Sequence, residues 1–353
     1  MIYIVVPFEA ATGGGESLHQ LARVLMEENQ NVSVFYSQSQ ISLKKKDTIT
    51  ECPHERFKRY RIPVAKTIED SSDNILIVPE VETHFFHRFR HIKKVIWWLS
   101  LTFFLAQKSF HNQAKLNVFQ HQWPSIMLPV AFFEALLRGR IKPSQHTYNF
   151  NSSESVFHLY NCEYARSFLV QNHVPEENML YLCGPIDDLY FREANNVSLE
   201  DKSGRVIAYN PAKDTGYAKA VTEFLQQQGV TVELAPIENM NKEEIAALLK
   251  RTRVYMDFGY FPGPERMPRE AVVMGCNIVT SKNGAANNHI DVPIPDAMKI
   301  ETIPDNVRHA AKVVQTLLEE YEAYQPFYEE YKSKVTAQVQ TFNRNVSLFL
   351  EKI

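Results

Sequence analysis

The chain has 353 residues, of which 44% are hydrophobic and 22% charged, and its formal net charge is −3. This length predicts about two domains, and the composition is that of a globular protein. A net charge so close to zero gives no general attraction to nucleic acid, so we expect no nucleic-acid partner.

The cysteines and the apolar runs bear on where the protein acts. The four cysteines include no CxxC pair and no Cys/His spacing typical of zinc, so we expect reduced, structural thiols in a cytoplasmic protein. The longest apolar run, Val95 to Ala106, has 12 residues, whereas a membrane-spanning helix needs about 20. The first residues do not form a secretory signal, because Glu9 follows a short apolar start at once.

The first half opens as an α/β fold. Residues 2–8, IYIVVPF, are a continuous apolar run rich in β-branched residues, which predicts a buried parallel strand. The loop TGGGES, an amphipathic helix over residues 18–29 and a strand over residues 31–36 follow. This order is typical of the start of an open α/β sheet.

The second half repeats the scheme and predicts a second domain. Its predicted strands are residues 205–211, 231–237, 254–260 and 276–281, and its predicted helices are residues 215–228, 242–251 and 268–274. Gly229 is a good end for the first of these helices. We therefore predict an N-terminal domain over residues 1–182, a hinge over 183–204 and a C-terminal domain over 205–320.

Residues 321–353 predict a long C-terminal helix. Its apolar residues alternate spacings of three and four, and they are Tyr324, Tyr328, Tyr331, Val335, Val339, Phe342, Val346 and Phe349. The stripe would either pack back on one or both domains or form a dimer helix, so both a monomer and a homodimer stay open.

A basic and aromatic segment follows residue 82. It is either a solvated approach to a buried strand or a patch that meets anionic lipid headgroups as a peripheral membrane contact. The patch would comprise His84, His87, Arg88, Arg90, Lys93 and Lys94, with Arg138, Arg140 and Lys142 added to it.

The glycines of TGGGES have two interpretations. The loop lacks the spacing GxGxxG and no acidic residue closes the second strand, which argues against a nicotinamide cofactor. Gly13, Gly14 and Gly15 would make a tight strand-to-helix turn, or they would let the backbone closely approach a phosphate or sugar.

Charged residues gather at two strand ends of the second half. Lys213 follows the first strand there, where open α/β sheets bind ligands and a lysine could neutralise a diphosphate. Arg266, Arg269 and Glu270 stand at the start of a helix, whose free N–H groups attract anions. Glu270 could accept hydrogen bonds from ribose hydroxyls, although a carboxylate at a helix start also has a purely structural explanation.

Candidates for acid–base chemistry are few. His121 lies after a short apolar run, and we name it as a candidate general base together with Glu9 at the end of the first strand. The sequence contains no Asp-x-Asp, and we expect neither a metal site nor another cofactor.

Several segments resemble the GT-B fold of bacterial glycosyltransferases, of the capsular or lipopolysaccharide type, near the retaining nucleotide-sugar transferases. In the second half these segments are YNPAKD, the stretch from VYMDFGYFPGPERMPREAVVMG to SKNGAANN, and DVPIPDAMK. PFEAATGGGESLHQLARVL, WWLSLTFF and LYNCEYARSFLVQNHV resemble the acceptor domain, and CGPIDDLYF resembles the hinge. The implied fold is α/β, with two Rossmann-like domains facing a cleft and a C-terminal helix packing back across them.

The resemblance also implies roles for residues. Lys213 would bind the donor diphosphate and Glu270 the nucleotide ribose. Asn283, Gly284 and Ala285 match a loop near the donor. Gly13 to Gly15 match the acceptor-domain loop that faces the diphosphate and the transferred sugar.

One departure from the family pattern affects the mechanism. The position eight residues before Glu270, where the family has a second glutamate, is Pro262. Glu265 and Arg266 are candidates to take over its role, so we name Lys213, Arg266 and His121 as the catalytic candidates.

The implied activity is transfer of a sugar, of the hexosyl type, from a nucleotide-sugar donor to a surface polysaccharide or lipid-linked saccharide. We expect the transfer to be independent of metal and to occur in the cytoplasm, at the inner face of the membrane if the acceptor is lipid-linked. A nucleotide-sugar epimerase or phosphorylase of the same fold, and a non-catalytic nucleotide-binding scaffold in a polysaccharide assembly complex, are the alternatives.

Overall fold

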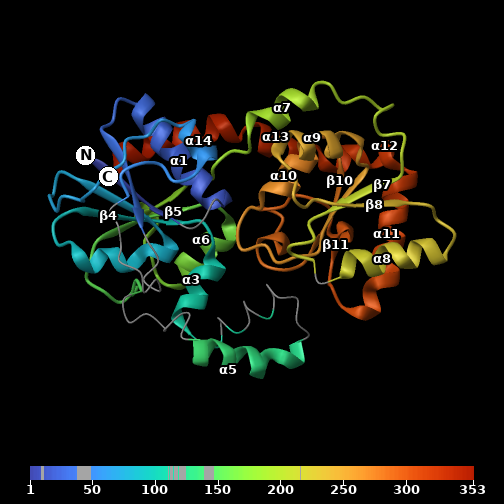
Figure 1. Ribbon diagram of the computed structural model, residues 1–353, viewed down its shortest axis with the longest axis horizontal. Helices are drawn as coiled ribbons and strands as arrows, with labels where there is room; N and C mark the ends of the chain where they lie inside the picture. The colour runs from blue at the N-terminus through green and yellow to red at the C-terminus, as the bar shows by residue number, and fades with distance from the viewer. Residues whose placement is uncertain are drawn as a thin grey trace. The chain divides into compact units, whose positions relative to one another are not determined.

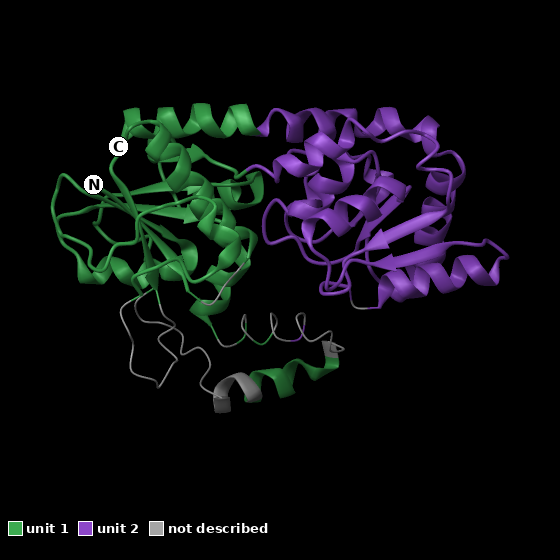
Figure 2. Cartoon of the chain, turned by 45° about the horizontal axis from the view of Figure 1, so that its top comes forward, with its two compact units in different colours: residues 1–117, 126–184, 339–353 green, residues 118–125, 185–338 purple. Residues whose placement is uncertain are grey.

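The computed structural model contains two parallel β-sheets, each covered by helices (Figure 1). The described residues are 1–8, 12–37, 49–109, 111, 114, 118, 125–138, 147–214 and 216–353, with only the backbone described at 125 and 134–138. The chain divides into two compact units, the first of residues 1–117, 126–184 and 339–353 and the second of residues 118–125 and 185–338 (Figure 2).

The first unit has a six-stranded sheet in the order β2-β1-β3-β4-β5-β6, with every neighbouring pair parallel. Its strands are β1 (Ile2–Pro7), β2 (Val32–Ser37), β3 (Ile75–Pro79), β4 (Lys93–Trp98), β5 (Val156–Tyr160) and β6 (Met179–Tyr181). Its helices are α1 (Gly13–Glu27), α2 (Glu55–Lys58), η1 (Glu80–Arg88), α3 (Leu101–Lys108), η2 (Ser125–Met127), α5 (Leu128–Arg138), α6 (Glu163–Gln171), η3 (Glu176–Asn178) and α14 (Gln338–Lys352), which starts at the last residue of the second unit.

Both faces of this sheet are buried, as the apolar sequence of β1 predicts. Ile2, Ile4 and Val6 point into a core shared with α1 and α14, whereas Tyr3 and Val5 point into a second core shared with α3 and α6. Side chains alternate between the faces of a strand, so a strand without polar residues must be covered on both sides.

The second unit has a five-stranded parallel sheet in the order β11-β10-β9-β7-β8. Its strands are β7 (Val206–Tyr209), β8 (Glu233–Pro236), β9 (Val254–Asp257), β10 (Asn277–Ser281) and β11 (Lys299–Ile300). Its helices are α7 (Asp188–Ala194), α8 (Tyr217–Gln227), α9 (Lys242–Arg251), α10 (Arg266–Val273), η4 (Ala285–Asn287), η5 (Asp296–Met298), η6 (Pro304–Asn306), α11 (Val307–Glu319), α12 (Tyr321–Tyr324), η7 (Gln325–Tyr328) and α13 (Glu329–Thr336).

The C-terminal residues are mostly helical, as predicted, but they do not form one helix. The short segment η7, which contains Pro326, separates α12 from α13. Proline has no backbone N–H to donate to a helical hydrogen bond, so it interrupts the helix here. The prediction that the stripe faces the protein core is confirmed, since Tyr331, Val335 and Phe342 are each at most 2% exposed. The Phe342 side chain, with those of Val346 and Phe349, packs into the core of the first unit.

Three helix starts differ from the prediction. α1 begins at Gly13 rather than Leu18, α10 begins at Arg266 rather than Pro268, and α8 begins at Tyr217 rather than at residue 215. Thr12 caps α1 by accepting a hydrogen bond from the backbone of Gly15 at 3.3 Å. This side-chain cap satisfies one of the free N–H groups of a helix whose glycines have low helix propensity.

Candidate functional site

The loops after β7, β9 and β10 lie at one edge of the second sheet, because the carboxyl ends of parallel strands meet there. Together with α10, which follows the loop after β9, they carry most of the residues that the sequence predicts for donor binding.

Lys213 lies on the turn after β7 and its ammonium pairs with the carboxylate of Glu265, which precedes α10. The turn is held by local contacts: the Asn210 side chain accepts from Ala212 at 3.1 Å, and Asp214 accepts from Gly216 and Ala218, each at 3.1 Å. Side chains that bond their own backbone fix such turns. The lysine therefore extends from a rigid turn toward the loop after β9.

Asp257, the last residue of β9, is buried close to this pair. Burial raises the pKa of its carboxyl group to about 6, and the nearby Lys213 ammonium opposes that rise. The two carboxylate oxygens accept hydrogen bonds from the Tyr255 hydroxyl at 3.1 Å and the Gly259 amide at 3.2 Å. From the sequence, Asp257 was predicted only as part of a strand.

The loops after β9 and β10 are joined by backbone contacts. Phe261 accepts a hydrogen bond from Ala285 at 2.9 Å and donates one to Asn283 at 3.3 Å. Gly284 has φ 64°, and a Cβ added to it would lie 2.1 Å from the carbonyl oxygen of Phe261. Gly284 is thus required by the backbone itself, while Asn283 is exposed and Ala285 is buried.

The two arginines of α10 differ in their surroundings. Arg269 is 5% exposed, and its guanidinium donates to the carbonyl oxygens of Glu265 and Pro264 and, at 2.5 Å, to Gln338. These contacts give Arg269 a structural function. Arg266 is half-buried at the first position of α10, where it carries positive charge at the helix N-terminus.

Glu270 is 7% exposed one turn into α10. Burial raises the pKa of its carboxyl group, and the charges of Arg266 and Arg269 and a hydrogen bond from Tyr190 oppose this. Tyr190 lies on α7, 80 residues earlier, and no local pattern in the sequence indicates this contact.

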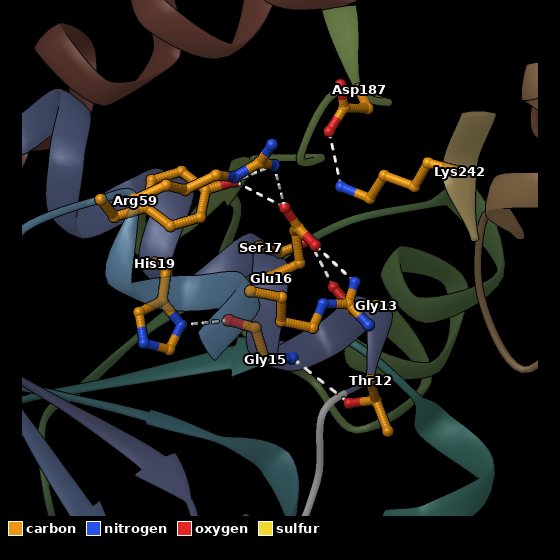
Figure 3. A network of polar contacts seen from close by, with 11 residues as sticks. Thr12, Gly13, Gly15, Glu16, Ser17, His19, Arg59, Asp187 and Lys242 are labelled. Atoms are coloured by element: carbon orange, nitrogen blue, oxygen red, sulfur yellow. Dashed lines mark hydrogen bonds and ion pairs between the residues drawn. The ribbon is translucent and has the colours of Figure 1, made fainter. Parts of the chain in front are cut away.

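In the first unit, Gly13, Gly14 and Gly15 are the first three residues of α1. Figure 3 shows Gly13 and Gly15 in this turn. A Cβ at Gly14 would meet only ordinary contacts, the nearest being Leu99 at 3.6 Å and Thr12 at 3.7 Å. The φ angle of Gly14 is not in the left-handed region. Within the described residues, neither packing nor backbone conformation therefore requires a glycine at position 14.

A buried carboxylate lies beside this helix N-terminus. Glu16 has no exposed surface and accepts hydrogen bonds from Arg56 at 2.5 Å, from Tyr60 at 2.7 Å and from Arg59 (Figure 3). The two guanidinium groups outweigh the single carboxylate, so the N-terminus of α1 lies in a positive environment. This cluster was not predicted from the sequence, because Arg56 and Arg59 are some 40 residues away in the chain.

The remaining predicted residues are placed as follows. His121 and Glu9 lie outside the described residues. Pro262, at the position of the missing family glutamate, is half-buried in the loop before α10. In the described part of the chain, no group of three or more His, Cys, Asp and Glu side chains is arranged to hold a metal ion.

The comparisons with known proteins support the fold. The sequence matches no protein-family model and no curated protein. Among solved structures, the chain is similar to a glycosyltransferase from Rickettsia africae, at 10% identity over 99% of this chain and 98% of that one, with a TM-score of 0.63. It is also similar to Alr3699/HepE of Anabaena in complex with UDP, at 13% identity, full coverage of both chains and a TM-score of 0.52.

A third similar structure is WaaG, a glycosyltransferase involved in lipopolysaccharide biosynthesis, at 10% identity over 98% of both chains and a TM-score of 0.53. At these identities the similarity concerns the fold. The chain has the GT-B fold, and the predicted fold class is confirmed.

The raised pKa of Asp257 predicts a pH-dependent stability. Its carboxyl group binds a proton more tightly in the folded protein, at about 6, than in the unfolded chain, at about 3.8. The tighter proton binding stabilises the folded protein by about 3 kcal/mol below pH 3.8, and this stabilisation is lost as the pH rises through 6. Asparagine does not titrate. We therefore expect the free energy of unfolding of the wild type to fall, relative to that of Asp257→Asn, by about this amount between pH 4 and pH 7.

Urea unfolding of both proteins at several pH values in this range measures the difference. Parallel pH profiles for the wild type and Asp257→Asn would show that the carboxyl group titrates normally.

Proposed function

We propose that the protein is a glycosyltransferase that binds the diphosphate and ribose of a nucleotide sugar at the carboxyl edge of the second sheet. The observation that carries the proposal is the ion pair between Lys213 and Glu265, which joins the loops after two neighbouring strands next to the start of α10. Glu270, one turn further on, would hold the ribose. Further support comes from the GT-B fold and from the similar Anabaena structure, which was solved with UDP.

The proposed chemistry is stabilisation of a departing diphosphate. Negative charge grows on this group as the sugar leaves, and positioned cations and helix N-termini stabilise such charge best in a site that excludes water. The ammonium of Lys213 would leave Glu265 and pair with the diphosphate instead. Arg266 and the N-terminus of α10 would add positive charge. These groups support a transfer that needs no divalent ion.

We infer that the transferred sugar is a hexose and that the acceptor is a surface polysaccharide or a lipid-linked saccharide. The similarity to WaaG, a glycosyltransferase involved in lipopolysaccharide biosynthesis, supports this acceptor class. Under this proposal the enzyme acts in the cytoplasm, and at the inner face of the membrane when the acceptor is lipid-linked.

A thermal-shift screen with UDP, GDP, CMP, ADP, dTDP and NAD, each with and without magnesium, tests the donor site. A ligand that binds the native state raises the melting temperature by mass action. We expect one nucleoside diphosphate to do so without magnesium. Binding without transfer to any acceptor would favour a scaffold, conversion of the nucleotide sugar without an acceptor would favour an epimerase or phosphorylase, and a response to NAD alone would exclude the proposal.

Replacing Lys213 by alanine tests the cation. We expect Lys213→Ala to lower kcat/KM by about 2–4 kcal/mol of transition-state stabilisation, because the leaving diphosphate loses its nearest point charge. Lys312→Ala, at an exposed position of α11, is the matched control and should be unchanged. Wild-type turnover in Lys213→Ala would remove the lysine from the site.

A second test separates a functional glycine from a structural one. Gly14→Ala should keep the melting temperature or raise it, since alanine is more favourable than glycine in a helix by about 0.5–1 kcal/mol. We expect its kcat/KM to fall at least about tenfold, because the new methyl group would stand where the donor approaches the backbone. Gly284→Ala, which clashes with Phe261, should instead lose stability.

Full transfer activity in a stable Gly14→Ala protein would show that this helix turn does not meet the donor.

Membrane contact is proposed for the short segment η2 and the helix α5 that follows it. Ile126, Val130 and Phe133, spaced four and three residues apart, are 84%, 50% and 61% exposed. This spacing places them on one face of a helix, and the basic residues Arg138, Arg140 and Lys142 follow in the sequence. An apolar helix face followed in the sequence by basic residues fits a membrane with anionic lipids.

The basic and aromatic segment named from the sequence is buried only in part, since His87, Arg88, Arg90 and Lys93 are exposed. Lys94 is buried and its ammonium pairs with Glu154 at 2.8 Å, so it does not belong to an exposed patch. The guanidinium of Arg88 lies over the ring of Phe85, 4.5 Å from its centre. No helix in the described ranges is long and apolar enough to cross a membrane.

Flotation with vesicles containing phosphatidylglycerol tests the surface at low salt. We expect the wild type to float with the vesicles and the triple variant Ile126→Ser/Val130→Ser/Phe133→Ser to stay in solution, because its apolar face is lost. Phe327→Ser, at another exposed aromatic position, controls for surface hydrophobicity. Equal flotation of the wild type and the triple variant would exclude α5 as the contact.

A further inference from the structure

Two carboxylates lie beside Lys213 at the candidate donor site. One belongs to Glu265, whose carboxylate pairs with the lysine ammonium. The other belongs to Asp257: a Cβ added to Gly259 would lie 2.6 Å from the Cβ of Lys213 and 3.1 Å from an oxygen of Asp257. The side chains of Lys213 and Asp257 therefore lie next to each other at Gly259, and in this group of three side chains one positive charge stands against two negative ones.

The two carboxylates differ in their freedom to move. The Glu265 side chain is 21% exposed and lies in the loop just before α10, so its carboxylate can turn toward water when the ion pair opens. Asp257 is 3% exposed at the end of β9, and its oxygens accept hydrogen bonds from the Tyr255 hydroxyl at 3.1 Å and the Gly259 amide at 3.2 Å. Asp257 therefore keeps its place when an anion binds beside it.

The surroundings of Asp257 suit both forms of its carboxyl group. Tyr255 is fully buried, and its hydroxyl can either donate a hydrogen bond to a carboxylate or accept one from a carboxylic acid. The second oxygen can keep the hydrogen bond from Gly259 in either form. A proton on Asp257 therefore leaves no polar group of this contact without a partner.

Binding of a diphosphate changes the charge around Asp257. In the described part of the chain, Lys213 from the loop after β7 and Glu265 from the loop before α10 act on this carboxyl group, and Glu270 of α10 acts on the hydroxyl of Tyr255. Thr280, the residue beside Asp257 on β10, is neutral. A diphosphate that takes the ammonium of Lys213 adds several negative charges, and like charge beside a buried carboxyl group favours its neutral form.

We propose that Asp257 takes up a proton when the donor diphosphate binds to Lys213, so that donor binding weakens as the pH rises. This inference rests on the proposed function, since it assigns the regulation of the donor site by pH to one residue. In the free protein, burial already raises the pKa of Asp257 to about 6, while Lys213 opposes the rise. A complex that binds more protons than the free protein loses affinity as the pH increases.

Calorimetric titration with UDP at pH 7, in two buffers with different heats of ionisation, counts the protons taken up on binding. We expect the wild type to take up about 0.5–0.9 of a proton more than Asp257→Asn, because the free carboxyl group is mostly ionised at this pH and the bound one mostly protonated. The terminal phosphate of the ligand itself titrates at about pH 6, and the comparison of two proteins with one ligand removes this contribution. Asparagine keeps the shape of the side chain and an acceptor oxygen, so the variant should fold.

The affinity gives a second readout. Between pH 6.5 and pH 8.5 the Kd of the wild type for UDP should rise by about tenfold relative to that of Asp257→Asn. If the thermal-shift screen selects another nucleoside diphosphate, that nucleotide replaces UDP in both measurements.

Asp201→Asn is the matched control. Asp201 also has a lysine partner, with its carboxylate 3.5 Å from the ammonium of Lys250, but it precedes β7 instead of following a strand. This variant should take up the same fraction of a proton as the wild type and should show the same dependence of Kd on pH.

Two results overturn the inference in different ways. If the wild type and Asp257→Asn bind the nucleotide with equal proton uptake and parallel pH profiles, Asp257 is not the proton acceptor, while the proposed function remains. If the wild type binds no nucleoside diphosphate at any of these pH values, the proposed function fails and the inference falls with it.

Discussion

The candidate donor site depends on positive charges and hydrogen-bond donors that balance the negative charges of its carboxylates at one sheet edge. Asp257 and Glu270 are buried, and Glu265 lies between them in the sequence. Three negative charges in a poorly solvated place would repel each other, and their balance comes from Lys213, from the two arginines of α10 and from neutral donors. An anionic ligand can bind to such a site if it replaces a carboxylate as the partner of one of the cations.

The two glycine positions show how the backbone and the ligand place different demands on the chain. Gly284 is fixed by its φ angle and by the carbonyl of Phe261, so it shapes the loop after β10 whatever that loop binds. Gly14 has neither constraint, and its helix turn lies close to the positive cluster around Glu16. The described residues therefore give a structural reason for Gly284 but none for Gly14.

Much of the fold could be predicted from the sequence, because apolar runs such as that of β1 indicate buried parallel strands. The sequence predicts the start of α1 five residues late, since glycines have poor helix propensity and only the structure shows that Thr12 caps the helix. Lys213 and Glu270 could be named from their places after a strand and at a helix start. Tyr190 could not, because its contact with Glu270 joins residues 80 positions apart in the chain.

A nucleoside diphosphate should bind at the carboxyl edge of the second sheet, and a crystal structure of the protein soaked with UDP would show whether it does. We expect the diphosphate within hydrogen-bond distance of the Lys213 ammonium, which has then left Glu265, and a ribose hydroxyl on the carboxylate of Glu270. UDP bound elsewhere, with the ion pair of Lys213 and Glu265 intact, would show that this sheet edge is not the donor site.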